Sequence, residues 1–91
     1  MKTSGNFKNG QPVLEQDGDT LTYYHVDGSI KAQGPCIDGQ FQGKWIFNKK
    51  SGQLWNVGHF KDNQKHGEWT RYKPDGTVEK TETFERGKKV N

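Results

Sequence analysis

A repeat with a period of 24 residues constrains this chain more than any other feature of its sequence. The best-formed unit spans residues 43–67, and a forward shift of 24 residues places Trp45 on Trp69 and Phe60 on Phe84. A backward shift of the same length gives a third, more divergent copy. A fixed period of this length is typical of repeat arrays, in which each unit buries its apolar side chains against its neighbours.

Each unit has the pattern of β-strands joined by tight turns. Apolar and polar residues alternate with a period of two, which indicates strands rather than helices. Gly28, Gly52 and Gly76 hold the same register in three turns, where a hairpin needs a positive φ. We therefore predict an all-β fold: a single-layer antiparallel meander of six or seven strands, built as successive β-hairpins from about three repeats, with no helix.

The repeats divide the chain into three units at residues 19–43, 44–67 and 68–90, within one domain. Residues 1–18 are predicted to hold a worn half-repeat and a connection. Its segment 5–10 matches the closing phrase at 34–39. We expect the connection after it, up to residue 18, to be extended or irregular because Pro12 disfavours regular strand pairing. Only 16 of the 91 residues are Leu, Ile, Val or Phe, whereas 11 are aromatic, so the core is expected to be thin and aromatic.

The hairpin register predicts two apolar faces. A turn at residues 74–75 pairs Arg71 with Val78, and the matching register in the second unit pairs Phe47 with Leu54. The first face then carries Trp45, Phe47, Leu54, Gly58 and Phe60, with Gly34 and Gly58 leaving room for a neighbouring ring. The second face carries Tyr24, Ile46, Trp55, Val57 and Tyr72. Because exposed apolar patches mark binding sites and Trp and Tyr often carry interface energy, these five are the candidate partner-binding residues.

The units resemble the variant MORN repeat, the bacterial form of the membrane occupation and recognition nexus repeat. The clearest copy is GEWTRYKPDG at residues 67–76, and residues 65–67 resemble the phrase that closes such a repeat. The likeness covers about residues 19–90, with a half-copy at 5–10. It implies an elongated sheet of stacked hairpins and a non-enzymatic role in scaffolding, protein contact or anionic-lipid binding, and some bacterial members are antitoxin-like. The chain departs from the pattern at Leu21, Cys36, Asn48 and Glu82.

Residues that often carry chemistry have simpler explanations here. Cys36 is the only cysteine, which excludes an intrachain disulfide, and it shares the register of Phe60 and Phe84, which predicts a core position. The spacing of His25, His59 and His66 matches no zinc pattern, so we expect structural or surface roles.

Catalytic and metal-binding motifs are likewise missing from the sequence. The acidic residues at 17 and 19 lack the further ligands of a calcium loop and match hairpin-turn chemistry instead. No nucleophile motif or phosphate-binding loop is present. We predict no enzymatic activity, no cofactor and no metal.

The leading functional hypothesis is a protein–protein interaction module, and a small inhibitor or antitoxin/immunity-type protein that binds a toxin or an enzyme is its sharpest form. A homodimer through face contact is a linked prediction, because charges near the C-terminus discourage edge pairing. The net charge of +3 leaves room for anionic lipid or another polyanion, and the rings of the second face with nearby cations leave room for single-stranded nucleic acid, but we favour both less. The lipid or polyanion alternative involves Lys49, Lys50, Lys61, Lys65, Lys88 and Lys89. The cations near the rings are Lys49, Lys50, Lys61 and Arg71. With no apolar signal core and one cysteine, a cytoplasmic location is expected.

Overall fold

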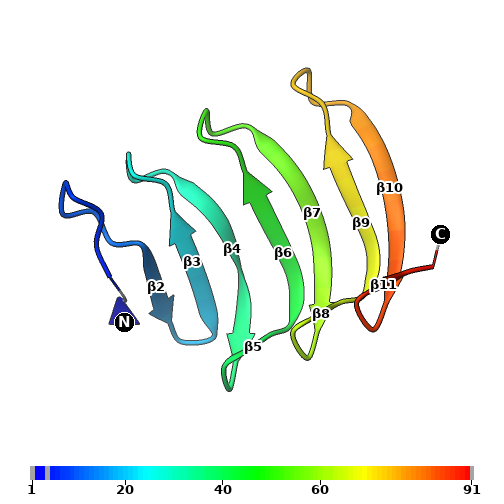
Figure 1. Cartoon of the computed structure of the whole chain (residues 1–91), viewed down its shortest axis with the longest axis horizontal. Helices are drawn as coiled ribbons and strands as arrows, with labels where there is room; N and C mark the ends of the chain where they lie inside the picture. Colours follow the sequence, from blue (N-terminus) through cyan, green and yellow to red (C-terminus); the bar gives the residue numbers. More distant parts are fainter. Residues whose placement is uncertain (1, 4, 91) are drawn as a thin grey trace.

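The computed structural model describes residues 2–3 and 5–90, which form one antiparallel sheet of successive hairpins (Figure 1). The predicted all-β meander without a helix is confirmed for these residues. Seven strands of four or more residues lie side by side in sequence order, as expected: β2 (Leu14–Asp17), β3 (Thr20–Tyr24), β4 (Ile30–Ile37), β6 (Gly43–Asn48), β7 (Leu54–Lys61), β9 (Gly67–Tyr72) and β10 (Val78–Glu85). Four two-residue strands complete the sheet: β1 (Lys2–Thr3), β5 (Gln40–Phe41), β8 (Gln64–Lys65) and β11 (Lys88–Lys89). The described residues contain no helix of the length and apolarity that crossing a membrane requires.

Two kinds of turn alternate at the two ends of the sheet. At the lower end in Figure 1, two-residue loops at 38–39, 62–63 and 86–87 place both residues at positive φ, as in Asp38 (53°) and Gly39 (78°). At the upper end, loops at 25–29, 49–53 and 73–77 each contain a glycine at φ 88–90°. The predicted register of these three glycines is confirmed.

A fourth upper turn lies at residues 7–11 and corrects our interpretation of the N-terminus. The Phe7 amide donates to the Gln11 carbonyl at 2.7 Å, the bond that the Lys49 amide makes to the Gln53 carbonyl. The segment 5–10 therefore matches the upper turn in structure, not the phrase at 34–39, and Figure 1 shows its loop at the same end as the other upper turns. Both segments carry a glycine after a short polar run, which made them indistinguishable by pattern.

The connection expected after this half-repeat is extended, one of the two forms predicted, but it pairs regularly in strand β2, which the presence of Pro12 was expected to disfavour. This strand pairs on one side with β1 and on the other with β3, where Leu14 faces Tyr23. Pro12 forms only an isolated bridge with Asn6, so its effect is confined to the start of the strand. Leu14 packs against the buried cluster of the core, and this burial favours regular pairing.

Each of the three upper hairpins contains a β-bulge at the same position of the repeat. Phe47 pairs with Asn56, but Asn48 pairs with Leu54, which leaves Trp55 as the extra residue. The extra residues are Lys31, Trp55 and Glu79, spaced 24 apart. The predicted pairs Phe47–Leu54 and Arg71–Val78 are therefore wrong. A bulge inserts one residue into one strand only, and strict alternation does not reveal it.

The core is a single layer of rings on one face, called here the aromatic face. Trp45 is fully buried and stacks on Phe41 with centroids 4.1 Å apart. Its ring lies over Gly34, and its Nε1 donates to the Pro35 carbonyl at 2.9 Å. One repeat later, Trp69 lies over Gly58 in the same way, so the predicted role of both glycines is confirmed. The face carries Leu21, Tyr23, Ala32, Cys36, Phe41, Trp45, Phe47, Phe60, Trp69 and Phe84.

This core is as thin as the composition predicted. Only Leu21, Ala32 and Trp45 are buried hydrophobic residues in the described part of the chain. Cys36 is half-buried and packs against them, at the slot predicted from its register. The molecule extends 41 × 34 × 17 Å, as expected of one layer of sheet with side chains on both faces.

The outer edge of β10 differs from the interior strands. Glu82 occupies the position that Gly34 and Gly58 hold in β4 and β7. Its carboxylate lies 2.9 Å from Lys89 Nζ and 3.5 Å from Lys80 Nζ. The hydrogen bond from Lys89, followed by the charges of both lysines, holds the pKa of Glu82 below its ordinary value. An ion-pair network therefore stands where interior repeats carry an indole over a glycine.

Candidate functional site

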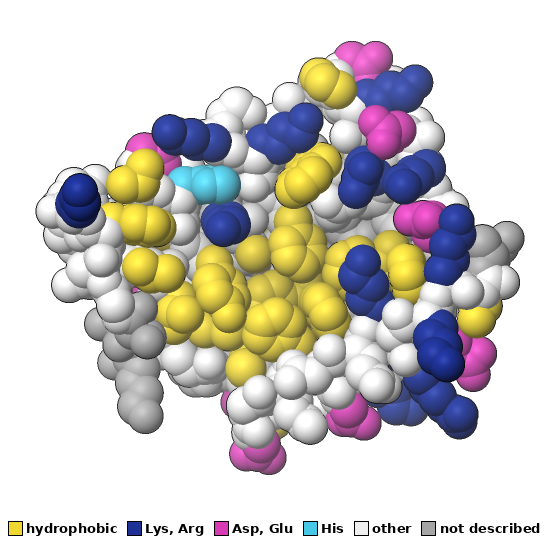
Figure 2. Space-filling model, in the orientation of Figure 1, with side chains coloured by type: hydrophobic (Ala, Val, Ile, Leu, Met, Phe, Trp, Pro, Cys, Tyr) yellow, Lys and Arg dark blue, Asp and Glu magenta, His cyan; other side chains and the backbone are white. Residues whose placement is uncertain are grey.

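A hollow of about 270 Å³ opens on the aromatic face beside the upper turns. We call it the turn-end hollow, and it lies between the loops at 25–29 and 49–53. Figure 2 shows this face, with hydrophobic side chains in a band across the strands and basic side chains gathered along the upper and right-hand sides. The residues that line the hollow are His25, Lys31, Phe47, Asn48, Lys49, Lys50 and Trp55.

Two of these residues reach the hollow because of the repeated bulges. Phe47 points to the aromatic face by simple alternation, since it pairs with Asn56 and follows Trp45 by two residues. Lys31 and Trp55 are bulge residues, and a bulge redirects its extra side chain relative to strict alternation. The sheet thus brings an aromatic floor and a lysine from the neighbouring repeat to one place.

Trp55 lies between two cations. Its ring centroid is 5.9 Å from Lys49 Nζ and 5.6 Å from the guanidinium carbon of Arg71. Arg71 pairs with Asn56 and Lys80, which places it on the aromatic face, so Trp55 lies there too. Trp55 remains 39% exposed, and it therefore holds the cations near the surface without being removed from solvent.

The polar groups inside the hollow already have partners in the protein. His25 Nε2 lies 3.1 Å from the Asn48 carbonyl, and Asn48 Nδ2 donates to the Ile30 carbonyl at 3.2 Å. The accessible lining is almost entirely carbon, from the rings and from the aliphatic stems of the lysines. The hollow thus combines an apolar floor with a cationic rim.

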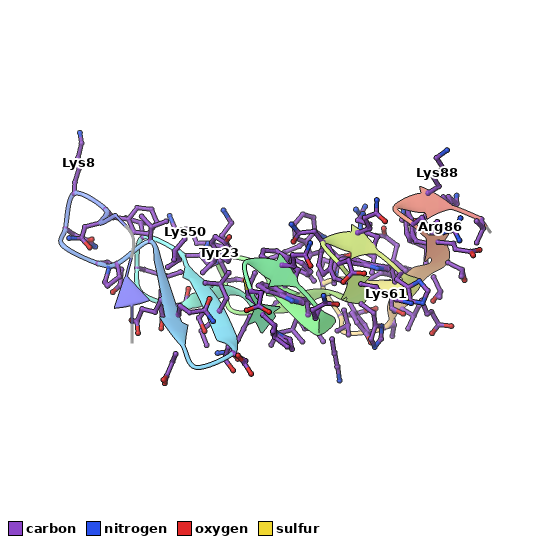
Figure 3. The ribbon with its side chains drawn as sticks, turned by 90° about the horizontal axis from the view of Figure 1, so that it is seen from below. Lys8, Tyr23, Lys50, Lys61, Arg86 and Lys88 are labelled. Atoms are coloured by element: carbon purple, nitrogen blue, oxygen red, sulfur yellow. The ribbon has the colours of Figure 1, made fainter. Side chains whose placement is uncertain are left out.

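The rim lysines are not neutralised by nearby acids. Among the described residues, Lys31, Lys49 and Lys50 have no carboxylate within 4.0 Å. The nearby carboxylate of Asp27 is engaged elsewhere: hydrogen bonds from the Ser29 hydroxyl and amide lower its pKa, with smaller contributions from the charges of His25 and Lys50. Figure 3, which views the sheet from below, shows Lys50 projecting to the same side as Tyr23 of the aromatic face. The rim therefore presents lysines that are not held in ion pairs within the described residues.

The aromatic face as a whole is basic. Its strand positions carry five cationic side chains against Glu79 and Glu82, namely Lys31, Lys65, Arg71, Lys80 and Lys89. Lys65 Nζ lies 4.7 Å from the centroid of a Trp69 ring and 4.8 Å from that of Phe84, so rings position this cation as well. Of these cations, Lys31 lines the hollow and Arg71 lies beside Trp55.

The five predicted partner-binding residues do not all share one surface. Tyr24, Ile46, Val57 and Tyr72 lie on the opposite face and are half-buried, as alternation predicted. Trp55 was assigned to that face wrongly, because the bulge turns it to the aromatic face. Leu54, which pairs with Asn48, lies on the opposite face, contrary to prediction.

The opposite face contains a flat, mixed surface. Ile46 and Val57 are directly paired, and the same cross-strand row continues through Thr70 and Thr81. Tyr24 lies near Glu15, and the pKa of its hydroxyl is raised by burial first and by that carboxylate second. Threonines continue this row on one side, whereas the turn-end hollow combines rings with lysines in a concave site.

A second hollow, of about 290 Å³, lies between the two lower turns near the C-terminus. Its lining includes the acids Asp62 and Glu85 as well as cations, and it has no aromatic floor. In the described part of the chain no three His, Cys, Asp or Glu side chains come together as metal ligands would. The turn-end hollow is therefore the better-formed site.

Sequence reasoning named Lys49, Lys50 and Trp55 but missed His25, Lys31 and Phe47 as lining residues. Phe47 had been assigned to the core, and Lys31 comes from another repeat. A signal for the site exists in the sequence: Asp27 with Ser29, and Asp75 with Thr77, are pairs that fix a five-residue turn, and such a turn shifts the pairing that follows it.

Comparison of the chain with known protein families, with curated proteins and with solved structures found no match. The likeness to variant MORN repeats therefore rests on the residues of the repeat alone.

Proposed function

We propose that this chain is a non-enzymatic binding module whose partner is another protein. The observation that carries the proposal is the turn-end hollow, where the apolar floor of Phe47 and Trp55 is surrounded by lysines without acidic partners. Aromatic anchors ringed by polar or charged groups are the usual composition of a protein interface.

The chemistry of the hollow supports binding over catalysis. Acid–base catalysis needs titratable groups in hydrogen-bond reach of a substrate. His25 uses Nε2 on the Asn48 carbonyl, and the remaining lining is rings, lysines and an amide that is itself bonded. What the hollow offers a partner is apolar contact and positive charge.

The finer form of the proposal is a small inhibitor or antitoxin/immunity-type protein that covers an acidic surface of a toxin or enzyme. It is supported by the small size of the module, by its basic aromatic face and by the resemblance to MORN repeats. We place the interaction in the cytoplasm, where the free thiol of Cys36 is stable. A homodimer through the paired Ile46 and Val57 of the opposite face is compatible with this use, because it leaves the hollow free.

Affinity capture from the source cells tests the proposal. Three baits are used in parallel: the wild-type chain, the site variant Lys49→Glu with Trp55→Ala, and the control variant Lys44→Glu. The control changes an exposed lysine in β6 away from the hollow. We expect one protein that is retained by the wild type and the control, is lost with the site variant, and binds again as a purified component. Capture that disappears on nuclease treatment, or that the site variant leaves unchanged, would refute the assignment.

A further inference from the structure

We infer that the turn-end hollow recognises an acidic, extended segment of the partner that carries one large apolar side chain, which enters the hollow while the flanking carboxylates meet the lysines. This inference rests on the proposed function and specifies the partner's chemistry. Three observations support it: the volume of the hollow, the scarcity of accessible polar atoms in its lining and the charge of its rim.

The volume suits a single side chain. At about 270 Å³ the hollow is smaller than the roughly 300–1,000 Å³ of typical small-molecule pockets. It is also open to solvent along the face, so a segment of chain can cross it with one side chain pointing down. The hollow is too small to enclose a whole cofactor or an extended acyl chain.

The scarcity of accessible polar atoms in the hollow favours an amino-acid side chain over a nucleobase. A base buried in the hollow would bring ring nitrogens and exocyclic groups that need hydrogen-bond partners. His25 and Asn48 are the polar lining side chains besides the lysines, and His25 Nε2 and Asn48 Nδ2 each already bond to a backbone carbonyl in the protein. A phenylalanine or leucine side chain has no such need, so it loses nothing on entering.

The cations around Trp55 lead to the same conclusion. Stacking of single-stranded nucleic acid uses open aromatic faces. Lys49 and Arg71 lie within 6 Å of the Trp55 ring centroid, where a stacked base would have to displace them. Carboxylates that approach from solvent can instead form ion pairs with Lys31, Lys49 and Lys50, which have no acidic partner within 4.0 Å among the described residues.

Short synthetic peptides test the inference on the full chain by fluorescence anisotropy. The first probe is an acidic peptide with one central phenylalanine. The second replaces the phenylalanine by alanine, and the third replaces the acidic residues by their amides. We expect the first peptide to bind, and each change to weaken binding by roughly ten- to a hundredfold, as expected for the loss of a buried ring or of the charges that pair with the rim.

Variants of the chain connect the effect to the hollow. Lys31→Gln with Lys49→Gln should weaken the first peptide about tenfold. Trp55→Ala should remove the difference between the phenylalanine and alanine peptides. Lys44→Gln, which makes the same kind of substitution once, in β6 on the opposite face, should leave binding unchanged. Circular dichroism checks that every variant keeps the sheet.

Several results would overturn the inference. They are equal binding of the phenylalanine and alanine peptides, equal weakening by Lys44→Gln, or no binding at about millimolar peptide. Tighter binding of a single-stranded oligonucleotide, or of phosphatidylserine vesicles, with the same dependence on Lys49 would assign the hollow to nucleic acid or lipid. If the peptides fail while a captured protein still requires Lys49 and Trp55, this inference fails and the proposed function stands; if neither requires these residues, both fail.

Discussion

Replacing Gly58 by alanine tests the packing that joins one repeat to the next. A Cβ at this position would fall within the ring of Trp69, closer to three of its carbons than real contacts allow. The ring has little room to move, because its Nε1 donates to the His59 carbonyl at 2.9 Å and the ring of Phe60 meets it edge-on at 5.1 Å. The added methyl group therefore forces either the indole or the strand to shift.

The magnitude follows from these contacts. Overpacking typically costs about 1–3 kcal/mol, and loss of the indole hydrogen bond adds about 1 kcal/mol, so we expect a loss of about 3 kcal/mol in the free energy of unfolding. A 91-residue domain has a stability of about 5–14 kcal/mol, and a thin core places this one near the lower end. The melting temperature should fall by about 12–24 °C.

Urea denaturation followed by circular dichroism measures the effect, with Asn56→Ala as the control. Asn56 lies on the same strand and face as Gly58, two residues away. In a Trp69→Leu background, Gly58→Ala should become neutral or slightly stabilising, because alanine restricts the unfolded chain more than glycine does. All variants are compared in the same concentration of sucrose, so that the least stable remain folded. A cost for Gly58→Ala no larger than that for Asn56→Ala would refute the reasoning.

Three further predictions concern single side chains. Trp45→Ala should cost about 3–5 kcal/mol, because this ring is fully buried, whereas Trp55→Ala should cost less than about 1 kcal/mol, and urea denaturation compares them. Hydrogen bonds from the Thr77 hydroxyl and amide lower the pKa of Asp75 from its ordinary value of 3.8. The contribution of Asp75 to stability is therefore present above that value and is lost as the pH falls through the lowered pKa. In thermal melts, Asp75→Asn, which keeps an acceptor oxygen, should lose less stability in acid than the wild type. Self-association through the opposite face should appear in sedimentation experiments as a mass that rises with concentration, and Ile46→Lys should abolish it, whereas an unchanging monomer mass in the wild type would contradict it.

The period of the sequence was sufficient to predict the meander, the order of the strands and the stacking of indoles over Gly34 and Gly58. These features depend on which residues recur at a fixed spacing, and recurrence is visible without coordinates. The slot of Cys36 followed from the same spacing.

The position of the site could not be predicted, because it depends on one inserted residue per hairpin. Alternation by two assigns each side chain to a face only while the register is unbroken, and the bulge at Trp55 breaks it. The error exchanged the faces assigned to Trp55 and Leu54. It also left unpredicted that Lys31 and Phe47 line the same hollow. At the N-terminus, Leu14 proved to be a strand residue because it packs on the core, a contact between segments that no local pattern around Pro12 reveals.

The glutamate on the outer edge of β10 has a consequence for how the molecule behaves in a crowded solution. The units of this array join by packing an indole over a glycine of the neighbouring strand, and nothing in that contact limits the number of units. If the last strand had the same glycine, a second copy of the chain could pair with it and continue the sheet. Glu82 fills that bare stretch with a carboxylate held by Lys80 and Lys89. Any strand that approaches must displace two ion pairs and bury a charge to gain one ring contact. We therefore expect this one side chain to interrupt the register that joins the repeats and to disfavour extension of the sheet from one copy to the next.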